Sequence, residues 1–147
     1  MRRVRRSAIV PHSVADMYAI VDDVASYPEF MPWCSDAREH ERSDELVVAS
    51  LELSRGGLSR WFTTRNRRHT PHRLDMQLVD GPFRALDGGW RFRELGGDGA
   101  EIRLDIEFEF DSFLVGLTFG PLFEYTCNSL VDAFVARAAA LHGHRQR

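Results

Sequence analysis

The sequence contains no lysine. All nineteen basic residues are arginine, and twenty-two acidic residues give the chain a formal charge of −3. A protein with this balance lacks the general excess of positive charge that non-specific nucleic-acid binding needs, which argues against a DNA-binding protein. Arginine does favour bidentate contact with phosphate or carboxylate, so a local basic patch could still bind such a group.

Cysteine is also scarce, and the two present, Cys34 and Cys127, lie far apart in the sequence. Neither has a partner at metal-ligand spacing, so we expect no zinc site, no metal and no disulfide framework, and a reducing cytoplasm fits best. The six histidines fall in turns, at strand edges or in the tail, where we expect them to be exposed.

Long apolar runs are absent as well. Residues 7–11 are too short for the apolar core of a signal peptide, and nothing elsewhere is long enough to span a bilayer. The length of 147 residues suits one compact domain over residues 1–147 with a sizeable core.

The periodicity of the apolar residues changes twice along the chain. Residues 4–10 are rich in β-branched residues and predict a strand, after which Ser13 is placed to cap a helix. Residues 36–110 follow a period of two, with turn residues that divide them into six strands of an antiparallel meander. Gly120 and Pro121 then start a long final helix with a wide apolar stripe.

The last strand shows this alternation most clearly. Apolar residues at 102, 104, 106, 108 and 110 alternate with charged residues at 101, 103, 105, 107 and 109. One face of the sheet is therefore apolar and the other charged. These patterns predict an α+β fold in which a curved antiparallel sheet of about seven strands packs against a long C-terminal helix.

Two aromatic segments, residues 27–34 and 81–92, are too apolar for ordinary solvated loops, and they indicate a binding mouth or a folded-down lid. Ordinary core packing is the alternative, and it is the stronger interpretation for the strand and helix positions. The predicted ligand-binding residues are Tyr27, Phe30, Met31, Trp33, Phe62, Leu78, Phe83, Trp90, Phe92, Phe108, Phe110, Leu130 and Phe134.

A cluster of arginines surrounds one predicted strand and its turn. It is a candidate contact with RNA phosphates, and the alternative is a solvated sheet face balanced by the acidic last strand. A membrane surface would attract the same residues. The residues of this possible RNA contact are Arg60, Arg65, Arg67, Arg68 and Arg73.

Catalysis finds little support in the sequence. The charged residues of the last strands alternate along each strand with the apolar residues. They should therefore lie on the opposite face of the sheet and face solvent. No histidine lies in an evident base-and-nucleophile arrangement, and we expect no catalytic residues.

Several separate blocks resemble the coenzyme-Q-binding START-domain family over nearly the whole chain. The blocks are Val10-Pro11 with Ser13-Val14 and Met17-Tyr18, residues 23–34, 62–66, 78–83, 89–92 and 108–110, and Ala133-Phe134 with Arg137-Ala138. The resemblance implies a helix-grip fold, in which the sheet wraps around the C-terminal helix and leaves an apolar cavity between them.

The family also implies two functions. Its quinone-binding members hold a polyprenyl quinone and support respiration, and its toxin-type members are described as binding the large ribosomal subunit and blocking its joining with the small one. We therefore expect non-catalytic binding of a polyprenyl quinone such as ubiquinone, with no required cofactor, in a cytoplasmic protein that visits the inner membrane. Ribosome binding is the alternative, and a cyclase-like enzyme ranks below both.

Overall fold

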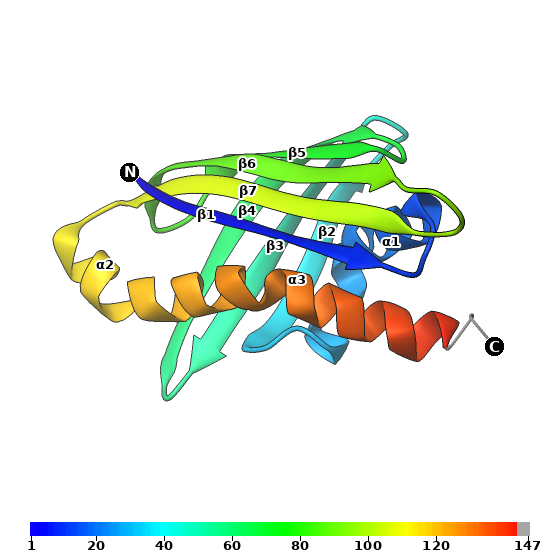
Figure 1. The fold of residues 1–147 in the computed structure, drawn as a ribbon. Coiled ribbons are helices and arrows are strands. Elements are labelled where there is room, and N and C mark those ends of the chain that lie inside the picture. Colours follow the sequence, from blue (N-terminus) through cyan, green and yellow to red (C-terminus); the bar gives the residue numbers. More distant parts are fainter. Residues whose placement is uncertain (144–147) are drawn as a thin grey trace.

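The computed structural model describes residues 1–143 as one curved sheet that wraps around a long helix (Figure 1). The strands are β1 (Arg2–Val10), β2 (Cys34–Arg42), β3 (Leu46–Arg55), β4 (Leu58–His69), β5 (Arg73–Asp80), β6 (Phe83–Glu94) and β7 (Ala100–Phe110). The helices are α1 (Val14–Asp22), the 3₁₀ helix η1 (Val24–Glu29), α2 (Phe113–Thr118) and α3 (Gly120–His142).

All neighbouring strands are antiparallel, in the order β1-β7-β6-β5-β4-β3-β2. Strands β2 to β7 form the predicted meander, and β1 pairs with β7 at the other edge. The predicted α+β fold with seven strands and a long C-terminal helix is therefore confirmed. No helix in the described part of the chain is long and apolar enough to cross a bilayer.

Local sequence signals determine where the two main helices begin. The Ser13 hydroxyl accepts a hydrogen bond from the Asp16 amide at 3.1 Å, which caps α1 as predicted. Pro121 lies in the first turn of α3, where its missing amide hydrogen costs nothing.

The core lies between the sheet and α3. In β7 the residues at even positions from Ile102 to Phe110 are buried, and the charged residues between them are more exposed. On α3, Phe123, Cys127 and Phe134 are buried against this apolar face. The alternation in the sequence thus correctly predicts which face of the sheet packs on the helix.

The structure differs from the sequence-based expectations in three places. The short helix α2 was not predicted. Phe83, expected in a loop at a binding mouth, is 5% exposed and begins β6. His12, expected at the surface, is 3% exposed. His144 lies outside the described residues.

Candidate functional site

An apolar cavity of about 70 Å³ lies between the sheet and α3. It is lined by residues of η1, of strands β3 to β7 and of the inner face of α3. Its lining residues are Val24, Tyr27, Met31, Ala49, Leu51, Leu53, Phe62, Thr64, Asn66, Leu74, Met76, Leu86, Trp90, Ile106, Phe123, Thr126, Cys127, Leu130 and Phe134.

Six of the thirteen predicted ligand-binding residues line this cavity: Tyr27, Met31, Phe62, Trp90, Leu130 and Phe134. The helix α3 supplies Leu130 and Phe134, and η1 supplies Tyr27. Phe134 is fully buried, and its ring packs edge-on against Tyr27, Phe30 and Trp90, with centroid distances of 5.2 to 5.5 Å. Phe134 therefore holds together the elements that form one wall of the cavity.

The other seven predicted residues lie elsewhere. Phe83, Phe108 and Phe110 form an aromatic cluster with Phe119 and Phe123 near the start of α3. These three residues point into the core, as their parity predicts, but they do not line the cavity.

The four remaining residues are more scattered. Phe92 packs on Tyr18, and Leu78 is a partly buried core residue. Phe30 is half-buried against Phe134, with the Arg137 guanidinium 4.9 Å from its ring centroid. Trp33 is 38% exposed and lies beneath Arg55.

Asn66 is a polar lining residue that the sequence analysis missed. Its side-chain oxygen accepts a hydrogen bond from the Thr64 hydroxyl at 2.9 Å, and the residue is 5% exposed. Within residues 1–143 its amide nitrogen has no hydrogen-bond partner. Alternation could have found it, because Asn66 has the same parity as Phe62 on β4.

The ionisable groups that line the cavity are held neutral. Burial raises the pKa of the Tyr27 phenol and of the Cys127 thiol well above their ordinary values. The Tyr27 hydroxyl donates a hydrogen bond to the carbonyl oxygen of Val21. Nearby, burial raises the pKa of Cys34 to about 11, so this thiol is protonated at neutral pH and unreactive.

The predicted arginine patch is divided among different environments. Arg65 and Arg67 alternate on β4 with Thr64 and Asn66, which line the cavity, so they project from the opposite, outer face of the sheet. Arg73 donates to Asp75 at 3.1 Å, and Arg60 is exposed at the far end of β4.

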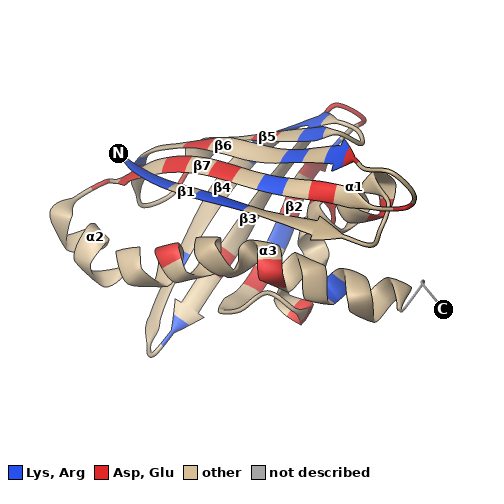
Figure 2. Ribbon diagram, viewed as in Figure 1, with Lys and Arg blue, Asp and Glu red and all other residues tan. Residues whose placement is uncertain are grey.

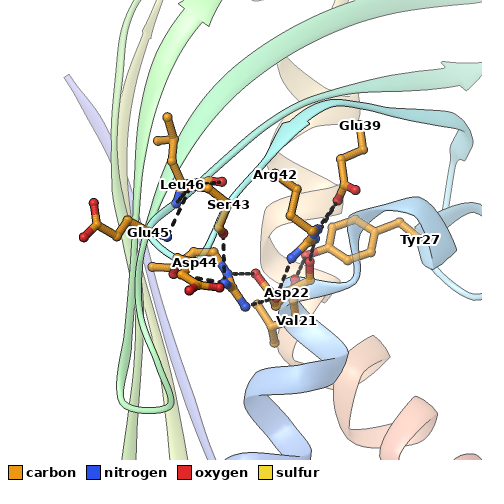
Figure 3. Close-up of polar contacts among 10 residues, drawn as sticks. Val21, Asp22, Tyr27, Glu39, Arg42, Ser43, Asp44, Glu45 and Leu46 are labelled. Carbon is orange, nitrogen blue, oxygen red and sulfur yellow. Dashed lines mark hydrogen bonds and ion pairs between the residues drawn. The ribbon is translucent and has the colours of Figure 1, made fainter.

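Arg68 does not belong to this outer face. Its guanidinium donates to both carboxylate oxygens of Asp22, at 3.0 and 2.8 Å, and to the carbonyl oxygens of Ser43 and Asp44. Arg42 donates to the same carboxylate at 2.9 Å (Figure 3). These bonds tie the end of α1 to β2 and β4, so Arg68 has a structural role.

The outer face carries charges of both signs, as Figure 2 shows along β1, β6 and β7. It has a hollow of about 520 Å³ at Gly88 and Gly89, where a β-carbon would come within 2.2 Å of a backbone oxygen of the neighbouring strand. The charged residues around this hollow are equally divided between four arginines and four acids: Arg3, Arg67, Arg91, Arg103, Asp75, Asp87, Asp105 and Glu107.

One ion pair on this face is bidentate. Arg3 donates to both Asp105 oxygens, at 2.9 and 2.8 Å, which lowers the pKa of the Asp105 carboxyl. Arg65, Arg67 and Arg91 have no ion-pair partner within the described residues. These three arginines are the ones on this face that could bind an external anion.

Comparison with known proteins agrees with the fold. Residues 10–135 match the family described as polyketide cyclase / dehydrase and lipid transport. An 18 kDa protein from Caulobacter crescentus, 32% identical, shares the fold with a TM-score of 0.75 over 98% of this chain and 100% of that one. The Zhui aromatase/cyclase from a Streptomyces species, 18% identical, has a TM-score of 0.69 over 97% of this chain and 88% of that one.

Two curated relatives bear on function. The ribosome association toxin RatA of Pseudomonas aeruginosa is 42% identical over 95% of this chain and 97% of its own. The mitochondrial coenzyme Q-binding protein COQ10 of Drosophila melanogaster is 26% identical over 88% of this chain and 55% of its own. The chain therefore belongs to the polyketide cyclase / dehydrase and lipid transport family, and it is similar over nearly its whole length to proteins named RatA.

Proposed function

We propose that this protein binds a hydrophobic molecule of the polyprenyl quinone type between the sheet and α3, and that it catalyses no reaction. The observation that carries the proposal is the apolar cavity between the sheet and α3, with one amide, Asn66, in its wall. The lipid-transport description of the family and the name of the COQ10 relative support the same class of ligand.

The cavity of about 70 Å³ must open to admit such a ligand, because pockets for small molecules measure about 300 to 1,000 Å³. Met31 and Met76 line the cavity with unbranched, flexible side chains that can repack. We therefore expect the cavity to enlarge when the ligand binds, and the ligand to be held mainly by non-directional apolar burial.

The ionisable groups around the cavity support the proposal that the protein catalyses no reaction. A general acid or base works best with a pKa near the working pH. Tyr27 and Cys127 are the titratable residues in the described lining, and burial raises the pKa of both far above neutrality. The aromatase/cyclase shares the fold with this chain, but low identity transfers no activity.

Asn66 is expected to recognise the headgroup, since its amide nitrogen can donate a hydrogen bond to a quinone carbonyl. Replacing Asn66 with leucine should weaken binding of a short-tail ubiquinone about tenfold, the effect of losing roughly one hydrogen bond. Binding of a prenyl hydrocarbon without carbonyl groups should not weaken. Fluorescence titration with both compounds measures the difference.

Thr126→Val is the matched control, because the Thr126 hydroxyl already donates to Leu122 within α3. It should leave the preference for the quinone over the hydrocarbon unchanged. Equal losses of affinity for both ligands in Asn66→Leu would show that Asn66 does not recognise the headgroup.

The proposal itself is tested by mild purification from a quinone-producing bacterium, organic extraction and mass spectrometry. Ala49 is 3% exposed and lines the cavity, so Ala49→Leu should fill the space with an apolar side chain. We expect a quinone in the wild type and none in this variant. Equal lipid in both proteins, or none in the wild type, would reject the cavity as the site.

A protein with this function would work in the cytoplasm and bind transiently to the inner membrane.

A second candidate function, ribosome association, is favoured by the relatives named RatA. In this proposal Arg65 and Arg67, which form no ion pair with any residue in the described part of the chain, contact phosphates of RNA in the large ribosomal subunit. The balanced charge of that face implies a specific contact rather than general RNA affinity.

A charge-reversal experiment tests this candidate. Arg65→Glu combined with Arg67→Glu should reduce co-sedimentation with large subunits. The slope of log binding constant against log salt concentration should become shallower by about 2, one for each phosphate contact. Arg55→Glu serves as an exposed control away from this face. Arg68 is unsuitable for this test, because its replacement would break the Asp22 cluster. Unchanged sedimentation of the double variant would exclude this surface.

A further inference from the structure

The short helix α2 exposes apolar side chains to an unusual degree. Phe113 is 83% exposed, Leu114 is 68% exposed and Leu117 is 59% exposed. The helix is nevertheless well formed, because the Ser112 hydroxyl caps it by accepting from the Val115 amide at 3.1 Å. Three large apolar side chains on six ordered residues form a patch of the kind that often marks an interaction site.

The patch lies in a stretch without charge. Residues 112–123 contain no acidic or basic residue, and Figure 2 shows α2 without a charged position. Two arginines lie beside the helix, but each has an acidic partner: Arg2 pairs with Glu124, and Arg84 pairs with Glu109 at 3.1 Å. The partner is therefore selected by apolar contact and not by charge.

The shape and size of the patch argue against a protein partner. The helix sits at one end of the molecule, beyond the sheet (Figure 1). Its three side chains expose roughly 400 Å², about half of the 800 Å² that a stable protein interface buries on each side. A small protruding apolar tip suits a deformable hydrocarbon layer, into which side chains insert one by one.

The side of α2 that faces the core, together with the start of α3, packs on Phe110. A β-carbon at Gly120 would lie 3.3 Å from the Phe110 ring, and one at Gly116 would lie 3.5 Å from it, so the chain packs closely there. Phe110 contacts Phe123, with ring centroids 6.1 Å apart, and Phe123 lines the cavity. Packed apolar side chains thus form a continuous path of contacts from the exposed helix through the aromatic cluster to the cavity.

We propose that α2 is a membrane-docking element that inserts Phe113, Leu114 and Leu117 into the apolar layer of a lipid bilayer. The proposal rests on the proposed lipid binding, since an apolar ligand that passes between cavity and bilayer needs such a path.

Flotation with phosphatidylcholine vesicles, which carry no net charge, tests the proposal on the full chain. The wild type should bind, and raising the salt from about 0.05 to about 0.5 M should not release it, because screening acts only on charge. Combining Phe113→Ser with Leu117→Ser should weaken binding by about a hundredfold or more, since each buried side chain of this kind contributes roughly tenfold or more. Ile9→Ser, at a 74% exposed position on β1, should bind like the wild type.

Three results would overturn the proposal: no vesicle binding by the wild type, equal binding by the double variant, or a dimer in sedimentation equilibrium that the double variant abolishes. The last result would make α2 an interface between two copies. Extraction of bound lipid from the same preparations separates the two proposals. Vesicle binding without bound lipid rejects the ligand but not the docking, and bound lipid without vesicle binding rejects the docking alone.

Discussion

Replacing Asp22 with alanine is expected to lower the free energy of unfolding by about 3 to 5 kcal/mol, as for other buried ion pairs that lose one partner. The Asp22 side chain is only 12% exposed, and it accepts hydrogen bonds from both Arg42 and Arg68. Without the carboxylate, the mostly buried Arg68 guanidinium loses its acidic partner and lies near that of Arg42, which keeps only Glu39. Urea denaturation followed by circular dichroism measures the loss.

Asp105→Ala is the matched control, because Asp105 pairs with Arg3 on the exposed outer face, where both side chains are more than 40% accessible. Such pairs contribute about 0 to 1 kcal/mol. A loss at Asp22 no greater than the loss at Asp105 would contradict the structural role of the Asp22 cluster.

This cluster also positions part of the candidate site. Asp22 ends α1, and η1 follows two residues later with Tyr27 in the cavity wall. Tyr27 is anchored to the same turn through its bond to the Val21 carbonyl (Figure 3). Replacing Asp22 should therefore alter the cavity wall at Tyr27 as well as lower the free energy of unfolding.

Replacing Phe134 with alanine is expected to cost about 3 to 5 kcal/mol of unfolding free energy, the range for a large buried ring. Phe134 is fully buried, and its ring contacts those of Tyr27, Phe30 and Trp90. Thermal and urea unfolding measure the effect, and Tyr125→Ala, at a 49% exposed position on α3, should cost far less. A loss below about 1 kcal/mol for Phe134→Ala would show that these contacts do not hold the wall together.

Because of these contacts, a charged substitution such as Phe134→Asp would be a poor test of ligand binding. This substitution removes the ring and buries a charge without a partner, so loss of the fold would explain any loss of ligand. Ala49→Leu avoids the problem because it adds apolar volume to the existing cavity and leaves the ring contacts in place.

The sequence predicts the fold well because the signals that determine it lie within single strands and helices. The strict alternation of β7 determines which of its faces is buried, and Ser13 and Pro121 determine where α1 and α3 begin. The helix α2 was not predicted, since six residues are too few to show a helical period.

The site is less predictable than the fold. Parity shows that Phe108 and Phe110 point inward, but only three-dimensional packing determines where space remains, and it remains beside Leu130 and Phe134. Arg68 resembles its neighbours Arg65 and Arg67 in the sequence. Its partner Asp22 is 46 residues away, so the pairing becomes visible only in the folded chain.

The most direct test of the central claim is methyl NMR of the labelled protein during titration with a short-tail ubiquinone. The account predicts saturable shifts at cavity methyl groups such as those of Ala49, Leu51 and Leu130, with no change at the exposed methyl groups of Ile9. The Ala49→Leu variant should show none of the cavity shifts. Shifts confined to surface methyl groups, or no shifts at any quinone concentration, would contradict an interior ligand site.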